Sequence, residues 1–232
     1  MKITIIRHAE PDYPNNTLTE KGFKEAEILG KYLKDAKLDY IYVSPFARAD
    51  YTAKGILKYN KNKNYETLEF LHEFLPFCWD KRPSYLNSDN RLYDKDKWVD
   101  VDGVADETLK TQYEWVKTEF NKLLEKHGYK KAGVYYEAVN PNHDNLVFVC
   151  HFGLESFLLS ELLNIPVQAL LNHTCASPTA ITTVYTEERE KGKAIFRLNV
   201  FGSVEHLIMS NEPVSFMARF DEVYGDGIDN IT

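Results

Sequence analysis

The chain has 232 residues, of which 44% are hydrophobic and 27% are charged, and its formal net charge is −7. This length is enough for one large domain or two small ones, and the composition is ordinary for a globular protein. The negative balance argues against a general binder of nucleic acids or membrane surfaces, which needs net positive charge or a dense basic patch. It does not exclude a small anionic substrate, because a few arginines can hold one locally.

The cysteines and the N-terminus bear on the cellular compartment. Cys78, Cys150 and Cys175 are widely spaced and form no CxxC pattern, so we expect free thiols and a cytoplasmic location. The apolar N-terminal run meets a charge at Arg7 and is too short for a signal peptide, and no stretch reaches transmembrane length. We find no linker, so we expect a single domain over residues 1–232.

The first predicted elements are a buried strand and an amphipathic helix. Residues 2–6 are apolar and mostly β-branched, which is typical of a buried strand. Apolar residues then recur at helical spacing up to about Leu33. Either Thr17, at capping-box distance from Glu20, or Thr19 can serve as the cap of this helix.

A second strand and helix follow, and after them a segment of different composition. Residues 38–43 predict a strand, and Ser44-Pro45 predicts the start of a helix, with serine as cap and proline at the first position. A short strand is expected near residues 67–71. Residues 76–105 are rich in Asp, Lys and aromatic residues and have no clear period, so we interpret them as an inserted lid over the functional edge of the sheet.

The second half begins with a long helical stripe. It starts near Leu109 and ends at His127, where a cation suits the helix dipole. An extra strand is expected at residues 133–139. Residues 146–150 form a continuous apolar run, which is typical of a buried parallel strand, and a helix is expected over residues 154–163.

Two further strands complete the pattern. Residues 180–185 and 195–201 are joined by a polar stretch, which suits a hairpin. The last thirty or so residues have a weak pattern. Strands that alternate with helices in this way predict a three-layer α/β/α fold with a mostly parallel central sheet.

Two of the predicted strands end on a histidine. Arg7-His8 follows the first strand, His151 follows the apolar run, and Arg48 comes shortly after another strand end. If these strands are neighbours, the four side chains meet at one edge of the sheet, where open α/β sheets bind ligands. Guanidinium groups match phosphate oxygens, and a neutral imidazole in line with phosphorus is a nucleophile. The pattern therefore predicts a phosphate site.

Six motifs in this order resemble those of the histidine phosphatase superfamily, which has the phosphoglycerate-mutase-like fold. The first and last of them contain the two histidines, and the resemblance covers most of residues 2–163. The motifs are Arg7-His8-Ala9-Glu10 (RHG followed by E or Q in the family), Leu18-Thr19-Glu20-Lys21-Gly22 with Ala26-Glu27 (LTxxGxxQA), residues 44–53 (SPLxRAxQTA), Leu71-His72-Glu73 (LxE), Asp106-Glu107-Thr108 (GES) and residues 149–153 (VSHGG).

The resemblance implies a hydrolase of phosphomonoesters that needs neither a metal nor another cofactor. His8 would be the nucleophile and form a phosphohistidine, while Arg7, Arg48 and His151 would bind the phosphoryl oxygens. Glu73 would protonate the leaving alcohol and then activate water. The partner would be a phosphorylated small-molecule substrate, with no nucleic acid and no membrane.

Several positions depart from the family pattern, and two of the implied roles have more than one candidate residue. Ala9 and Phe152 replace glycines of the family motifs, and Pro11 stands where many members have Thr or Ser. The asparagine that contacts phosphate in the family has no motif match in this chain, and either Asn16 or Asn15 could take its place. Three nearby carboxylates compete with Glu73 for the role of the acid, namely Glu66, Glu69 and Glu10.

Two other functions stay open. A mutase of the same superfamily would need a second anion site, yet residues 76–105 contain Arg82-Pro83 without an arginine pair or a proline run, so a hydrolase is favoured. A non-catalytic module that binds a phosphorylated ligand would usually lack the nucleophile or the acid, and both His8 and Glu73 are present.

Overall fold

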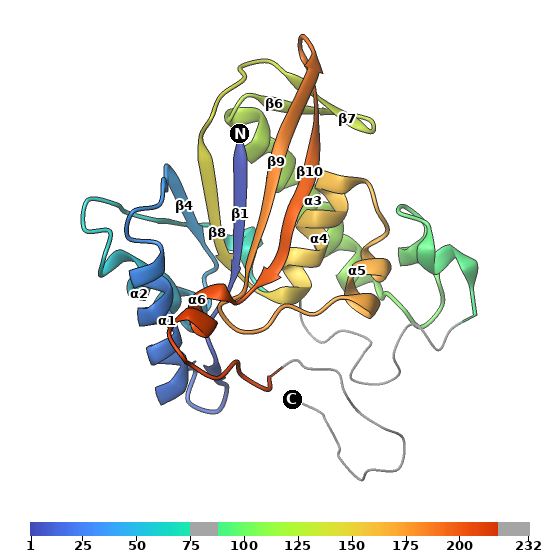
Figure 1. Cartoon of the computed structure of the whole chain (residues 1–232). Helices are drawn as coiled ribbons and strands as arrows, with labels where there is room; N and C mark the ends of the chain where they lie inside the picture. Colours follow the sequence, from blue (N-terminus) through green and yellow to red (C-terminus); the bar gives the residue numbers. More distant parts are fainter. Residues whose placement is uncertain (75–87, 218–232) are drawn as a thin grey trace.

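The computed structural model describes residues 1–74 and 88–217 (Figure 1). In this part of the chain, a central sheet has the strand order β5-β4-β8-β1-β9-β10-β7-β6. The strands are β1 (Lys2–Arg7), β4 (Tyr40–Val43), β5 (Glu66–Thr67), β6 (Tyr129–Ala132), β7 (Tyr135–Ala138), β8 (Asn145–Cys150), β9 (Ile181–Glu190) and β10 (Lys193–Ser203). From the pairings, only β9 and β7 run against the common direction, so the mostly parallel sheet is confirmed.

Helices cover both faces of this sheet (Figure 1). One face carries α1 and α2, and α6 packs against α1, whereas α3 and α4 cover the other face with α5 beside α4. The helices are α1 (Glu20–Tyr32), α2 (Ala47–Leu57), α3 (Glu107–Lys126), α4 (Phe152–Leu163), α5 (Val167–His173) and α6 (Glu205–Met209). The predicted three-layer architecture is therefore confirmed.

The central strand β1 is buried on both faces. Ile3 and Ile5 belong to the hydrophobic core beneath α3 and α4, whereas Ile6 belongs to the core beneath α1 and α2. Successive side chains of a strand point to opposite faces, so a strand inside a three-layer fold must be apolar on both. This is why the sequence shows a continuous apolar run there. No helix in residues 1–74 or 88–217 is long and apolar enough to span a membrane.

The prediction that Ser44 and Pro45 start a helix is wrong. The helix α2 begins at Ala47 with Phe46 as its N-cap. The Ser44 hydroxyl accepts the Phe46 N–H at 3.3 Å, but it also lies 2.7 Å from Nε2 of His151, so this side chain serves a long-range contact as well as a local one.

The start of the preceding helix settles the choice between two caps. Thr19 is the N-cap of α1, and its hydroxyl accepts a hydrogen bond from the N–H of Gly22. Thr17 instead belongs to a two-residue strand, β3 (Thr17–Leu18), which pairs with β2 (Pro11–Asp12).

Other boundaries differ from the prediction in informative ways. The strand expected at residues 67–71 is the short β5 followed by a 3₁₀ turn, Glu69–Leu71. The hairpin strands β9 and β10 extend through the polar stretch up to a tight turn at Gly192, where φ is +82°. The sequence pattern missed β6, α5 and α6, which are short.

Residues 88–105, the described part of the predicted lid, contribute to the core. They form two 3₁₀ turns, Asn90–Tyr93 and Trp98–Asp100. Leu92 and Trp98 are fully buried in the hydrophobic cluster beneath α3 and α4. Aromatic residues without a regular period here serve packing. Residues 76–87, the rest of the predicted lid, lie outside the described residues.

Candidate active site

Three parallel strands end together at one edge of the sheet. In the strand order, β8 lies between β4 and β1. The His8 N–H donates to the Cys150 carbonyl at 2.9 Å, and the Ser44 N–H donates to the Val149 carbonyl at 3.0 Å. The residues that follow β1, β4 and β8 are thereby fixed beside one another, as the sequence pattern requires.

Two buried imidazoles face each other at this edge. The ring centroids of His8 and His151 are 5.0 Å apart, and the two residues are 2% and 0% exposed. Nδ1 of His8 lies 2.7 Å from the Ala9 carbonyl, so this nitrogen carries the proton and Nε2 keeps a free lone pair. His151 uses Nε2 on Ser44, and its buried Nδ1 has no hydrogen-bond partner among the described residues.

Two arginines frame the histidines. Arg7 is buried and donates from Nη1 to the Ala176 carbonyl at 2.6 Å. The Arg48 guanidinium lies 4.7 Å from the ring centre of Phe46 and 5.5 Å from that of Tyr13. Nε of each arginine is buried without a hydrogen-bond partner in the described part of the chain. Both guanidinium groups therefore have unused donors at the edge of the sheet.

The electrostatics keep both histidines neutral. Burial, followed by the charges of Arg7 and Arg48, lowers the pKa of His8 well below its ordinary value of 6.5. Burial also lowers the pKa of His151, with His8 and the same arginines adding to the effect. Near neutral pH, His8 therefore presents an unprotonated nitrogen.

Glu73 lies against the start of α4. Its Oε1 accepts a hydrogen bond from the Leu154 N–H at 3.0 Å, and its Oε2 accepts one from the Gly153 N–H at 3.3 Å. Burial raises the pKa of Glu73, while the charges of Arg48 and Arg7 oppose that shift. A carboxyl group with a raised pKa beside two arginines can carry a proton at the site.

The competing carboxylates are placed differently. Glu66 and Glu69 are exposed. Glu10 accepts hydrogen bonds from the hydroxyls of Thr19 and Ser215, at 2.9 and 2.5 Å. Of the four carboxylates considered from the sequence, Glu73 is the one that accepts hydrogen bonds from the start of α4, directly after His151.

Gly153 allows the Glu73 carboxyl group to approach the start of α4 closely. A Cβ atom at this position would lie 2.6 Å from Oε1 of Glu73, closer than real Cβ contacts. Phe152 can replace the first glycine of the family motif, because the close approach occurs at the second.

We expect Gly153→Ala to lower kcat by about 10–100-fold through displacement of the Glu73 carboxyl group, because errors of about 1 Å in a catalytic group have effects of that size. Steady-state kinetics together with thermal unfolding measures this. Ser156→Ala, on the same helix, serves as a control that adds no atom. Unchanged kcat in a folded Gly153→Ala protein would show that the position of Glu73 is unimportant.

Two threonines that the sequence reasoning did not single out hold the backbone of the site. The Thr52 hydroxyl accepts from the Ala9 N–H at 2.9 Å and donates to the Arg48 carbonyl at 2.7 Å. Thr179 has a left-handed φ of +59°, and its N–H is 3.3 Å from the His8 carbonyl. Thr52 lies within a recognised motif and could have been found, whereas Thr179 comes from a loop with no sequence signal.

A second buried carboxyl group was also missed. Glu155 of α4 is 1% exposed, and burial raises its pKa to about 7. The charge of Arg7 lowers this pKa, and that of Glu73 raises it. The site thus contains two carboxyl groups that influence each other's protonation.

The two asparagines lie in the exposed turn between β2 and β3. The Asn15 side chain donates to Asp12 at 2.8 Å, and Asn16 has a φ of +50°. Tyr13 of the same turn does reach Arg48. A phosphate contact from Asn16, or from Asn15, stays a prediction.

Glu25 supports the first motif from α1. It is fully buried, and its Oε2 accepts the Glu10 N–H at 2.9 Å. Burial raises the pKa of Glu25 from 4.5 to about 7, with the charges of Glu10 and Glu212 acting in the same direction. The folded protein therefore binds a proton more tightly than the unfolded chain, and its free energy of unfolding should fall as pH rises from 4.5 to about 7.

We expect Glu25→Gln to remove this pH dependence and to raise the free energy of unfolding by about 2–3 kcal/mol above neutral pH. The glutamine oxygen can still accept the Glu10 N–H. Urea unfolding at about pH 5 and about pH 8 measures the effect, with exposed Glu20→Gln on the same helix as the control. A wild-type pH dependence retained in Glu25→Gln would contradict the assignment.

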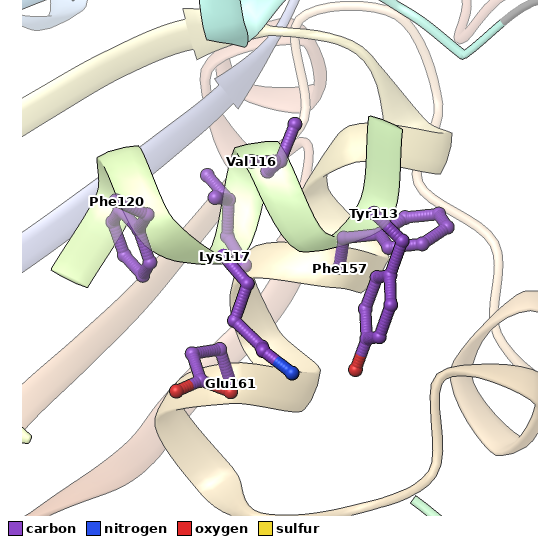
Figure 2. Close-up of a pocket in the computed structure, with 7 residues that line it drawn as sticks. Tyr113, Val116, Lys117, Phe120, Phe157 and Glu161 are labelled. Atoms are coloured by element: carbon purple, nitrogen blue, oxygen red, sulfur yellow. The ribbon is translucent and has the colours of Figure 1, made fainter. Parts of the chain in front are cut away.

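A separate small pocket lies between α3 and α4 (Figure 2). Aromatic rings of both helices line it, together with Lys117 and Glu161. None of the residues predicted for the phosphate site borders this pocket. In residues 1–74 and 88–217, no group of three or more His, Cys, Asp or Glu side chains has the arrangement of a metal site.

Several solved structures with the same fold are phosphatases by name. Phosphoserine phosphatase from Entamoeba histolytica superposes with a TM-score of 0.60 and 21% identity, covering 89% of this chain and 98% of that one. A mycobacterial glucosyl-3-phosphoglycerate phosphatase gives a TM-score of 0.62 and 18% identity, covering 87% and 98%. A putative α-ribazole-5′-P phosphatase from Escherichia coli gives 0.58 and 18%, covering 88% and 97%.

Sequence comparisons define the family. The fructose-2,6-bisphosphatase TIGAR of Xenopus tropicalis is 32% identical over a segment covering 25% of this chain and 25% of that protein. The chain thus matches about a quarter of the length of this curated relative. The family model described as the histidine phosphatase superfamily, branch 1, matches residues 3–199. This match shows that the chain belongs to the histidine phosphatase superfamily.

Proposed function

We propose that this protein hydrolyses phosphomonoesters through a phosphohistidine formed on His8, without a metal ion. One observation carries the proposal. Buried nitrogens of Arg7, Arg48 and His151 without partners in the described residues gather beside an imidazole whose Nε2 is free. A phosphoryl group supplies oxygens for such donors, and the two guanidinium charges neutralise it.

The first step transfers the phosphoryl group to His8. Nε2 attacks phosphorus as the bond from phosphorus to the ester oxygen breaks, and Glu73 gives its proton to the departing oxygen. The Nδ1–H keeps donating to the Ala9 carbonyl, so the ring keeps its orientation while charge develops. The Ser44 hydroxyl can donate to Nε2 of His151, which leaves the Nδ1–H of His151 free to bind a phosphoryl oxygen.

The second step returns the enzyme to its starting state. Glu73, now a carboxylate, takes a proton from water, and the resulting hydroxide attacks phosphorus while the bond to Nε2 breaks. Inorganic phosphate leaves, and Glu73 again holds the proton needed for the next substrate. The raised pKa of Glu73 suits both roles, because the group must give and take a proton near neutral pH.

The names of the relatives support a small phosphorylated metabolite as the substrate class, and no partner beyond it is proposed. The wide spacing of the cysteines supports the cytoplasm as the location. A mutase remains the second candidate by family resemblance, but Arg7 and Arg48 both belong to the one phosphate site described.

The proposal is tested by measuring hydrolysis of p-nitrophenyl phosphate by the purified protein in the presence of EDTA. We expect turnover that EDTA does not reduce, and no interconversion of 2- and 3-phosphoglycerate. Loss of activity in EDTA that added metal restores would overturn the metal-independent mechanism. Interconversion of the phosphoglycerates would establish the mutase instead.

A further inference from the structure

A strip of rings leads away from the phosphate site. We define the ring strip as Phe46, His72 and Trp115. The Phe46 ring centroid is 5.3 Å from that of His151 and 6.3 Å from that of His72. The His72 ring is in turn 5.6 Å from Trp115, which is 39% exposed. The rings therefore form a continuous path from the phosphate-binding histidine to solvent.

The geometry of phosphoryl transfer places the leaving group on this path. The departing oxygen lies opposite the attacking nitrogen, so it faces away from His8 and toward the acid. That acid is Glu73, and His72 is its neighbour in the chain. Phe46 lies beside His151, which would bind the same phosphoryl group, so carbon atoms attached to the departing oxygen can reach the inner end of the ring strip as they extend toward solvent.

Charges of both signs lie beside the ring strip. The Arg48 guanidinium lies 4.7 Å from the Phe46 ring centre, and Glu69 acts on His72. Burial lowers the pKa of His72, so its ring is neutral near neutral pH. Because the two flanking charges are opposite, a charged substituent gains no net attraction along the strip, and the rings favour an uncharged one. Phe46 also stands where the family pattern SPLxRA has leucine, so this chain has a ring at the innermost position of the strip.

We propose that the preferred substrates are phosphomonoesters whose alcohol carries an uncharged planar ring, which packs on Phe46, His72 and Trp115. This assignment rests on the proposed function and adds the chemical class of the leaving group. Rings prefer offset or edge contacts with centroids about 4.5–7 Å apart, and the exposed Trp115 offers a ring for such a contact at the outer end of the strip.

Matched substrate pairs test the ring independently of leaving-group chemistry. 2-Phenylethyl phosphate and butyl phosphate are both esters of primary alcohols and differ in the ring. We expect the ratio of their kcat/KM values to be about tenfold in favour of the ring. Trp115→Ala should reduce this ratio to about twofold, and Trp115→Phe should restore most of it. A ratio near one in the wild type, or one that Trp115→Ala leaves unchanged, would overturn the inference.

Two further arms complete the design. The kcat/KM values of adenosine 5′-monophosphate and ribose 5-phosphate are compared as a second pair. A preference for adenosine 5′-monophosphate identifies the ring as a nucleobase, while a preference confined to the phenylethyl pair identifies it as an arene. Tyr185→Ala is the matched control, because this exposed ring pairs with Lys2 at the opposite end of β1 from the site.

Hydrolysis of butyl phosphate that disappears in His8→Ala keeps the proposed function intact even where the ring preference fails. Hydrolysis that persists in His8→Ala refutes the proposed function itself.

Discussion

Replacing His8 by alanine is expected to reduce kcat for any phosphomonoester by more than about 10³-fold, because the covalent step loses its nucleophile. The effect should not depend on the leaving group, since even a good leaving group needs an acceptor for the phosphoryl group. Steady-state hydrolysis of p-nitrophenyl phosphate measures it.

The His8 variant should remain folded. Among the described residues, the side chain makes one hydrogen bond, to the adjacent Ala9 carbonyl, and removing an imidazole from between two arginines leaves their other contacts in place. Inorganic phosphate should still raise its unfolding temperature, because Arg7 and Arg48 are retained. Exposed His143→Ala is the control and should keep full activity. A folded His8→Ala protein with wild-type kcat would exclude His8 as the nucleophile.

Replacing Glu73 by glutamine is expected to have an effect that depends on the leaving group. For butyl phosphate, kcat/KM should fall by about 10²–10³-fold, because the alkoxide cannot leave without a proton. For p-nitrophenyl phosphate, whose phenolate leaves readily, phosphorylation should be slowed much less. Equal losses of kcat/KM on both substrates would show that Glu73 has a structural role and is not the acid.

The pH profile gives an independent check on the same residue. As pH falls through the pKa of His8, below 6.5, the nucleophile becomes protonated and kcat/KM declines. As pH rises through the pKa of Glu73, above 4.5, the acid loses its proton and kcat/KM for butyl phosphate declines again. Glu73→Gln should abolish the second decline and leave the first. A profile whose alkaline limb survives in Glu73→Gln would assign that limb to another group, such as Glu155.

The part of the site that lies on strands could be predicted from the sequence. His8 and His151 each follow an apolar run, and parallel strands that end together bring such residues to one edge. The continuous apolar runs were sufficient here because β1 and β8 are buried on both faces and must be apolar throughout. Short elements such as β6 and α6 were not predicted, because a few residues do not establish a period.

The contacts that orient these residues could not be predicted in the same way. Ser44 has every local feature of a helix cap, yet it bonds to His151, which is 107 positions away in the chain. Thr179 lies in a loop and supports His8 with a left-handed backbone conformation, which is not expected for a threonine. Glu155 is one of several polar residues of α4, and its burial beside Arg7 follows only from how this helix packs. Tertiary partners decide such positions, so local patterns do not reveal them.

The covalent intermediate is the central claim, and rapid quenching of Glu73→Gln with radiolabelled p-nitrophenyl phosphate tests it most directly. This variant forms the phosphoenzyme from a good leaving group but lacks the base that activates water, so the intermediate should accumulate. We expect about one equivalent of label per chain, labile in acid and stable in base as for a phosphoramidate, on the peptide that contains His8. No burst of label, or label that persists when His8 is also replaced, would contradict the mechanism.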